Sequence, residues 1–163
     1  MPDLEVLENP KTNLASEVIS SDGKTLGKYY FNDNRTPVTF DELPKHLVDA
    51  LIATEDIRFY SHSGIDFKRT FGAALKLGKD GGGSTITQQL AKLLFTGEGS
   101  RDILERLTQK FKEYIIAVRL ERHYTKDEII TQYLNLYDFG NNGDGIRSAA
   151  RIYFGKEPID LDI

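Results

Sequence analysis

The chain contains no cysteine and no tryptophan among its 163 residues. Without cysteine it has no disulfide framework, no thiolate metal site and no thiolate nucleophile. No apolar run approaches the roughly 18 to 20 residues that a bilayer-spanning helix requires. The chain also has no excess of positive charge: the formal net charge is -4 and the isoelectric point is about 5.4. General nucleic-acid binding usually needs a basic surface, so we expect no nucleic acid among the partners.

What is present is typical of a globular domain. Apolar residues make up 39% of the chain and charged residues 28%, which excludes a disordered polymer. The length is enough for one domain with a hydrophobic core and too short for two of ordinary size. No signal peptide is visible at the polar N-terminus, and the last residues, 157–163, show no capped helix. We therefore expect a single domain over residues 1–163, with any membrane anchor outside it.

The pattern of turns, caps and apolar periodicity predicts a mainly α-helical domain with a small N-terminal β-hairpin. The hairpin is predicted over residues 16–31, around the turn dipeptide Asp22-Gly23. A first helix is predicted to run from Pro44 toward Thr54, and a second from a Thr85–Gln88 capping box through Leu94. A third is predicted over 102–122, and a fourth from a Thr125–Glu128 capping box to Leu134. A loop at Gly140–Gly145 is followed by a short helix through Ala149 and Ala150.

The first candidate for chemistry is Glu55, which follows an apolar helical stripe. A carboxylate at the end of such a stripe is partly desolvated, which favours its neutral form and suits it to proton transfer. The alternative is that Glu55 and Asp56 only end a helix, with Arg58 as a surface partner. On the local pattern alone, this second interpretation is the commoner one.

The second candidate is the segment from Gly81 to Lys92, in which a glycine-rich loop leads into a helix. Such a loop presents free backbone N–H groups to an anion. It is not a Walker A loop, because no lysine stands between the glycines and Ser84. An ordinary glycine loop before a well-capped helix explains the same pattern. Residues of this segment that we predict to bind substrate are Ser84, Thr85, Gln88, Gln89 and Lys92.

The third candidate is the predicted helix from Arg101 to Arg122. We expect its buried stripe to consist of Leu104, Leu107, Phe111, Ile115 and Val118. Arg106, Lys110 and Glu113 recur at steps of four and three on the opposite face. This face is either a solvated surface with intrahelical ion pairs or a cationic strip that faces an anionic substrate. Of the two interpretations, the pattern alone favours the solvated surface.

The three histidines carry no recognisable chemistry. His46, His62 and His123 lack the spacing of metal ligands, and we expect them to be structural or surface residues. We predict no metal site built by protein ligands alone. A Ser-His-Asp triad is not indicated either, because the sequence gives Ser84 no base partner.

Taken together, these segments resemble the glycosyltransferase domain of class A penicillin-binding proteins and of monofunctional glycosyltransferases. Residues 55–64 match the motif ED-x-x-F-x-x-H-x-G, and residues 82–92 match GGSTITQQLAK without a gap. Residues 110–121 match a third motif, residues 124–135 the stretch Y-x-K-x-E-I-x-x-x-YLN, and residues 145–156 the segment G-I-x-x-A-A-x-x-YFGK. The resemblance covers about residues 16–160.

The resemblance implies a lysozyme-like helical fold and the polymerisation of lipid II by inverting glycosyl transfer. It implies that Glu55 is the catalytic base and that Glu113 is the second catalytic carboxylate. Undecaprenyl pyrophosphate is the implied leaving group, received by the substrate-binding residues already named together with Arg106, Lys110 and Lys112. No cofactor is required by this scheme, although it allows a divalent cation, Mg²⁺ or Mn²⁺, at the pyrophosphate.

The same resemblance implies the setting of the enzyme. The expected partners are lipid II, the growing glycan chain, the membrane surface and cell-wall or division proteins. The expected location is the extracytoplasmic face of the cytoplasmic membrane. The family fold continues past Lys156, so we expect this chain to hold only part of it, without the anchor or any transpeptidase domain. Two alternatives remain open: a glycan-cleaving enzyme of the same broad fold, and a non-catalytic fragment that binds lipid II or a division protein.

The chain departs from the family pattern at several positions. Gln109 and Gly72 stand where arginine is common, Leu93 where asparagine is common, and Arg147 where glutamate is frequent. Lost guanidinium groups remove bidentate contacts to phosphate that lysine does not reproduce. Arg69, Arg101 and Arg106 are the candidates to replace them.

Overall fold

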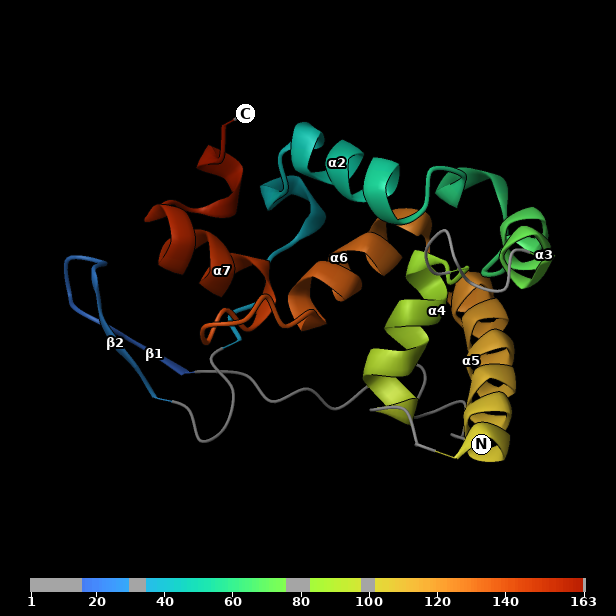
Figure 1. The fold of residues 1–163 in the computed structure, drawn as a ribbon. Helices are drawn as coiled ribbons and strands as arrows, with labels where there is room; N and C mark the ends of the chain where they lie inside the picture. Colours follow the sequence, from blue (N-terminus) through green and yellow to red (C-terminus); the bar gives the residue numbers. More distant parts are fainter. Residues whose placement is uncertain (1–15, 30–34, 76–82, 98–101, 163) are drawn as a thin grey trace.

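A computed structural model describes residues 16–29, 35–75, 83–97 and 102–162 of the chain. Helices make up most of this part, and the described strands form one two-stranded sheet near the N-terminus (Figure 1). The predicted fold class, a mainly α-helical and lysozyme-like domain with a small hairpin, is confirmed.

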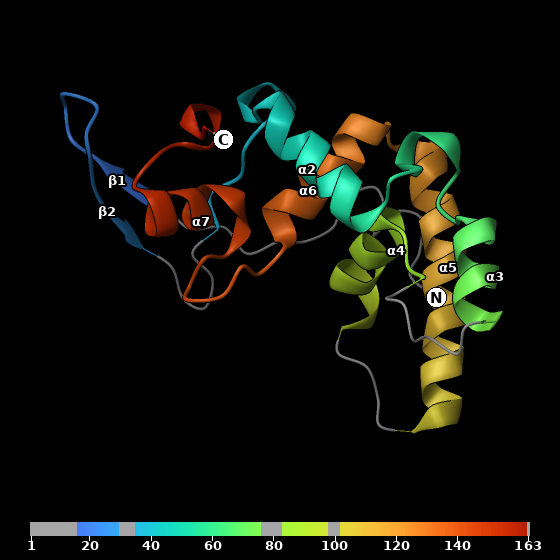
Figure 2. The same cartoon turned by 45° about the horizontal axis from the view of Figure 1, so that its top comes forward.

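The hairpin consists of strands β1 (Ser16–Ile19) and β2 (Thr25–Tyr29), which pair antiparallel. Gly23 makes the turn with a φ of 80°, a left-handed conformation that favours glycine. The hairpin extends away from the helices in two views (Figures 1 and 2). Its apolar side chains Val18, Ile19 and Leu26 are exposed. The prediction is confirmed over the described strands, and residues 30 and 31 of the predicted range lie outside the described part.

The predicted helices are present, with boundaries that differ by a few residues. The α-helices are α2 (Lys45–Glu55), α3 (Phe67–Leu75), α4 (Ile86–Ala91), α5 (Ile103–His123), α6 (Lys126–Leu136) and α7 (Gly145–Phe154). Short 3-10 turns η1 (Phe40–Glu42), η2 (Phe59–Ser61) and η4 (Pro158–Asp160) separate some of them. The Thr85–Gln88 and Thr125–Glu128 capping boxes are both formed.

Three details of the prediction are corrected by the structure. Helix α3 was not predicted as a separate element. The helix that begins after Thr85 does not run regularly to Leu94, because α4 ends at Ala91 and continues as the π-helix η3 (Lys92–Thr96). Helix α7 extends beyond Ala150 to Phe154, where Gly155 ends it in the left-handed conformation.

Helix α4 is central to the core. It lies between α5 and α6 (Figures 1 and 2), and most of its residues are buried. The buried apolar side chains come from every helix around it, and the largest fully buried ones are Phe59, Ile86, Leu90, Ile116, Leu120, Ile129 and Ile130. A helix buried on so many sides is unable to tilt or slide without opening the core.

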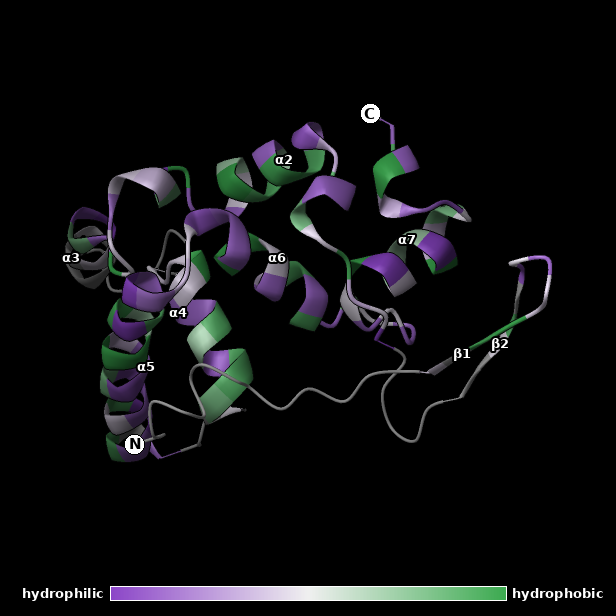
Figure 3. Ribbon diagram, turned by 180° about the vertical axis from the view of Figure 1, so that it is seen from behind, coloured by the Kyte–Doolittle hydropathy of each residue, from purple (hydrophilic) through white to green (hydrophobic). Residues whose placement is uncertain are grey.

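The orientation of α5 contradicts the sequence prediction. Leu104, Leu107, Phe111 and Ile115 were expected to be buried, yet they expose 73%, 54%, 66% and 45% of their surface. The buried face instead carries Glu113, Ile116, Ala117 and Leu120. Figure 3 shows hydrophobic residues (green) at intervals along the whole of α5. Several of these residues are exposed to solvent.

The reversal has a physical reason in the partners that α4 offers. The polar groups of the buried face of α5 find hydrogen bonds there: Lys110 reaches Ser84, and Glu121 accepts from Thr87. Burial of a polar group that is hydrogen-bonded costs little. The sequence pattern shows two apolar stripes on this helix, and hydrophobicity alone does not distinguish them.

A close backbone contact fixes the loop after η2 against α5. Gly64 has a φ of +89°, and a Cβ atom placed there would lie 2.8 Å from the carbonyl carbon and oxygen of Ala117. The side chain of Thr85 bonds to the Gly64 carbonyl oxygen at 2.7 Å. Only glycine fits this position, which joins the loop to both α4 and α5.

We predict that Gly64→Ala destabilises the domain more than Gly155→Ala does. Both glycines have a positive φ, but no atom lies within 4 Å of a Cβ placed at Gly155. The control should lose about 1 to 2 kcal/mol from the left-handed backbone, and Gly64→Ala about 1 to 3 kcal/mol more from the clash. Chemical denaturation measures both. Equal losses would show that the contact with Ala117 relaxes freely.

Candidate active site

Glu55 is the last residue of α2, and its side chain is half-buried. The C-terminal end of a helix disfavours negative charge, so a carboxylate there gains from a hydrogen-bond donor. Gln89 of α4 supplies one, because its amide Nε2 lies 2.8 Å from Oε2 of Glu55. The predicted base is thus held through Oε2 by a neutral donor.

Gln89 is itself held from the other side. The hydroxyl of Tyr133 on α6 donates to Oε1 of Gln89 at 3.1 Å. Tyr133 is buried, and burial together with the nearby negative charge of Glu55 raises the pKa of its phenol. The phenol therefore stays protonated and remains a donor. Tyr133 was not among the predicted site residues, although it stands in the matched YLN stretch.

A second cluster brings a cation and a carboxylate to the start of α4. The ammonium of Lys110 on α5 lies 2.7 Å from Oγ of Ser84 and 2.7 Å from Oε2 of Glu113. Glu113 is buried, whereas Lys110 keeps part of its side chain exposed. Ser84 and Gln89 belong to the same short segment, so this cluster and the Glu55 cluster are both attached to α4.

Asp56, next to Glu55, secures α4 from inside the core. Its buried carboxylate accepts from the backbone N–H of Ile86 at 3.1 Å, and its Oδ2 lies 3.0 Å from Nε2 of His62. An acceptor at the first N–H groups of a helix satisfies donors that have no intrahelical partner. The expectation that His62 is structural is confirmed by this contact.

The backbone of Glu55 is secured by an arginine and an aspartate. The guanidinium of Arg69 donates to the carbonyl oxygen of Glu55. The backbone N–H of Arg69 in turn donates to the buried carboxylate of Asp66, which also pairs with Arg58 at 2.7 Å. Burial alone would raise the pKa of Asp66, but the hydrogen bonds from Arg58 and Arg69 outweigh it and hold the pKa below its ordinary value.

A partly buried ion pair joins α4, α5 and α6. Lys126 bonds to Glu121 at 2.8 Å and to the carbonyl oxygen of His62 at 2.7 Å. Its ammonium also lies 4.2 Å from the centre of the Phe59 ring, within the range of a cation–π contact. Thr87 donates to the same glutamate at 2.6 Å. Sequence reasoning did not find this group, because its members come from four separate segments.

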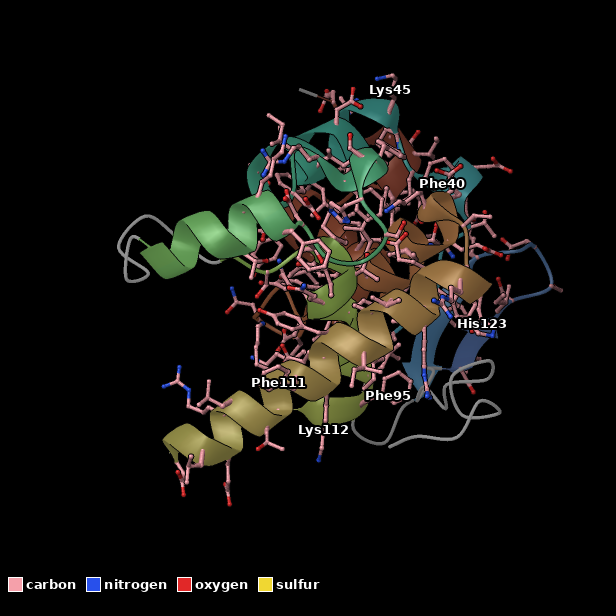
Figure 4. All side chains as sticks on the ribbon, turned by 90° about the vertical axis from the view of Figure 1, so that its right-hand side faces the viewer. Phe40, Lys45, Phe95, Phe111, Lys112 and His123 are labelled. Atoms are coloured by element: carbon pink, nitrogen blue, oxygen red, sulfur yellow. The ribbon has the colours of Figure 1, made fainter. Side chains whose placement is uncertain are left out.

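The predicted substrate-binding residues divide into three groups. Ser84, Gln89 and Lys110 lie in the two clusters described above. Thr85 and Gln88 are fully buried and form the capping box of α4. The burial of both side chains favours a role in the scaffold, and their predicted contact with substrate stays a prediction. Lys92, Arg106 and Lys112 are exposed, and Lys112 extends away from the domain in Figure 4.

The departures from the family pattern have local explanations. Gln109 donates to the carbonyl oxygen of Gly97 at 3.4 Å, at the end of η3. Arg147 bonds to Glu42 and lies 3.3 Å from Glu157, so its positive charge is matched by two carboxylates. Around Gly72 a Cβ would meet nothing within 4 Å. Of the arginines considered as replacements, Arg69 lies at the backbone of Glu55, Arg106 is exposed, and Arg101 lies outside the described residues.

The residues of the site do not fit a divalent cation held by protein ligands. Oε2 of Glu113 already bonds to an ammonium, and a paired carboxylate is a poor ligand for a second cation. Within residues 16–29, 35–75, 83–97 and 102–162, no three His, Asp or Glu side chains gather in a metal-binding group. Over the same residues, no helix is both long and apolar enough to cross a membrane.

The geometry places the half-buried carboxylate of Glu55, at the end of α2, and the ammonium of Lys110, on α5, against partners in residues 84–91, which comprise Ser84, the N-cap Thr85 and helix α4. Such an arrangement belongs to enzymes that remove a proton at one point and stabilise an anion at another.

Comparison with known proteins identifies the family. Residues 22–163 match the family model described as Transglycosylase. The chain is 42% identical over 153 residues to penicillin-binding protein 1F of Bacillus subtilis, covering 91% of this chain and 21% of that protein. It is 40% identical to penicillin-binding protein 1A of Escherichia coli and 38% identical to that of Pseudomonas aeruginosa, covering 100% of this chain in both cases and 19% and 20% of those proteins.

The chain therefore belongs to the transglycosylase family, and the resemblance inferred from its motifs is confirmed. The chain spans about one fifth of the length of the relatives it matches.

We predict that Asp66→Asn lowers the free energy of unfolding by about 1 to 3 kcal/mol at pH 7, because it removes a hydrogen-bonded buried charge. Since the folded pKa of Asp66 is below its ordinary value of 3.8, its contribution is complete above that value and is lost as the pH falls through the folded pKa. The deficit should therefore shrink at pH 3.

Urea denaturation at both pH values measures this effect. Asp49→Asn is the matched control, because Asp49 is exposed and pairs only with Lys45 on the surface of α2. The control should change stability by no more than about 0.5 kcal/mol at either pH. A deficit for Asp66→Asn that is the same at pH 3 and pH 7 would contradict the assignment.

Proposed function

We propose that the chain polymerises lipid II into glycan strands by inverting glycosyl transfer, with undecaprenyl pyrophosphate as the leaving group. The observation that carries this proposal is the attachment of two clusters to α4, one around Glu55 and one around Lys110. The reaction needs a base and a charge sink, and the short segment of residues 84–91, which contains α4, supplies a partner to each: Gln89 to Glu55 and Ser84 to Lys110.

Glu55 acts as the base in this proposal. Its carboxylate removes the proton from the 4-hydroxyl of the acceptor sugar. The resulting oxygen attacks the anomeric carbon of the lipid-linked chain, and the bond to the pyrophosphate oxygen breaks on the opposite side. The hydrogen bond from Gln89 to Oε2 leaves Oε1 of Glu55 without a bond to Gln89, and this oxygen is the one that we assign to the proton.

Lys110 and Ser84 receive the leaving group. The ammonium and the hydroxyl lie 2.7 Å apart at the start of α4, so that both reach one phosphate oxygen. Their charge and hydrogen bonds stabilise the developing negative charge of the pyrophosphate. Lys92, Arg106 and Lys112 are exposed, and we propose that they contact the anionic substrate outside this cluster. The proposed steps use no divalent cation.

Glu55 and Glu113 take different roles because their surroundings differ. Glu113 is buried, and its Oε2 already accepts a hydrogen bond from the ammonium of Lys110. It orients Lys110 toward Ser84 and thus acts as a positioning residue for the leaving group. Glu55 is accessible and bound to a neutral amide, so it retains the ability to accept a proton.

The exposed stripe on α5, Leu104, Leu107, Phe111 and Ile115, supports a membrane surface as a partner. These side chains follow helical spacing on one face, and an apolar face of this kind marks a contact with membrane or protein. Lys112 lies beside this stripe on α5 and is exposed, as expected for a side chain that reaches anionic head groups. A lipid-linked substrate requires the enzyme to work at the membrane, so we assign the domain to its extracytoplasmic face. Cell-wall or division proteins remain proposed partners.

We predict that Glu55→Gln abolishes the polymerisation of lipid II and leaves the fold intact, because the amide keeps the shape of the carboxylate and accepts no proton. Gel analysis of labelled lipid II measures chain growth, and circular dichroism checks the fold. Lys45→Gln, on the surface of the same helix, is the control and should retain activity. Near-normal polymerisation by Glu55→Gln would contradict the role of Glu55. Release of muropeptides from purified cell wall by the parent chain would favour the glycan-cleaving alternative.

We also predict that Leu107→Ser with Phe111→Ser weakens binding to anionic phospholipid vesicles by about tenfold or more, because each change removes an exposed apolar side chain from the lipid contact. Cosedimentation with vesicles measures the binding. Ile152→Ser with Phe154→Ser is the matched control, since both side chains are also exposed but lie on α7. Equal losses in the two double variants would contradict the assignment of the α5 stripe.

A further inference from the structure

Tyr133 links the hydrophobic core to the proposed base. Its ring is buried in the core cluster with Leu90 and Ile130, and its edge packs near Tyr137. Its hydroxyl nevertheless points to the amide of Gln89, which in turn donates to Glu55. Three side chains from α6, α4 and α2 thus form one continuous hydrogen-bonded chain.

The direction of the donors in this chain is set by chemistry. An ionised carboxylate only accepts hydrogen bonds, so the amide of Gln89 has to present Nε2 to Glu55. Its Oε1 then faces Tyr133, where only a donor is satisfied. A buried phenol is such a donor. If the amide turned over, Oε1 would face the carboxylate, and two acceptors would repel each other. The phenol would then have to accept from Nε2, and its own proton would lose its partner on Gln89.

The three side chains of this chain differ in flexibility, and this difference shows which of them orders the others. Glutamate and glutamine each have three rotatable bonds, and fixing them costs conformational entropy. A tyrosine ring packed on all sides has almost no such freedom. The fixed end of the chain is therefore Tyr133, and the end that it orders is the Glu55 carboxylate.

We propose that Tyr133 is a positioning residue for glycosyl transfer, which acts through Gln89 to hold the Glu55 carboxylate toward the acceptor hydroxyl. This role rests on the proposed function of Glu55. Partners that orient a reacting group in this way commonly change activity by 10- to 100-fold. Tyr133 does not touch the substrate, so its effect should fall on the rate of the chemical step and not on substrate binding.

The test is a double-mutant cycle with Tyr133→Phe and Gln89→Met in the full chain, with lipid II as substrate. Tyr133→Phe removes only the hydroxyl, and Gln89→Met replaces the amide by an apolar group of similar length. We expect Tyr133→Phe to lower kcat by about tenfold and to leave KM for lipid II within about twofold. We expect the double variant to be as slow as Gln89→Met alone. Tyr60→Phe, at an exposed tyrosine, is the control and should match the parent chain.

The outcomes separate this inference from the proposed function. If the parent chain turns over lipid II and the two losses multiply in the double variant, Tyr133 does not act through Gln89, and the inference is wrong while the function stands. If the parent chain has no turnover, both are wrong. A rise in KM with unchanged kcat would also overturn the positioning role.

A second measurement covers the case in which Gln89→Met does not fold. In the folded Tyr133→Phe variant, the side-chain amide signals of Gln89 in a ¹⁵N NMR spectrum should shift, and those of Gln109, which bonds to the carbonyl oxygen of Gly97, should not. Unchanged Gln89 signals would show that the hydroxyl does not order the amide, and would overturn the inference without any measurement of activity.

Discussion

Helix α4 is buried on most sides although it carries threonine and glutamine side chains, and such a helix is stable only where these groups find partners. Asp56 accepts the N–H of Ile86, and the capping box of Thr85 and Gln88 satisfies further donors at the same end. The partners come from the loop after α2 and from α5 and α6. Hydrogen bonds to the polar groups of α4 therefore fix the positions of these elements as much as packing against its leucine and isoleucine does. The proposed site depends on this constraint, because both of its clusters are attached to α4.

The fold could be predicted in outline from the sequence because caps and turns act locally. The Thr85–Gln88 and Thr125–Glu128 boxes each bond within one helical turn, and their spacing is visible in the sequence. Which face of α5 is buried was not predictable in this way. Its hydrophobic residues form two stripes, and the stripe with Ile116 and Leu120 was buried because its polar neighbours meet partners on α4. Those partners come from elsewhere in the chain, so helical periodicity carries no information about them.

The site was predictable to the extent that single residues carry the chemistry. Glu55, Lys110 and Ser84 were identified from their types and motifs, and the structure brings the last two together. Thr85 and Gln88 show the limit of this approach, because a hydroxyl and an amide in a glycine-led segment suit either a ligand or a helix cap. The structure shows the cap, and the contact with substrate stays a prediction. Tyr133 was missed because a tyrosine on the apolar face of a helix is ordinarily a core residue. It is one here as well, and its additional role depends on the position of its hydroxyl alone.

The same residue explains why a base is found at the exposed end of a helix. A glutamate side chain at such a place is expected to be mobile, because the C-terminal end of a helix disfavours its negative charge and water competes for hydrogen bonds to its oxygens. A single orientation of the carboxylate therefore requires a hydrogen-bonded link to a side chain that is already fixed. The buried ring of Tyr133 in the core is such a side chain. Gln89 is long enough to span the distance, and its amide offers both a donor and an acceptor. Catalytic order at Glu55 is therefore tied to the packing around Tyr133. A core substitution that shifts the Tyr133 ring without unfolding the domain should disturb the base before it disturbs the leaving-group cluster, whose carboxylate and ammonium come from α5 alone.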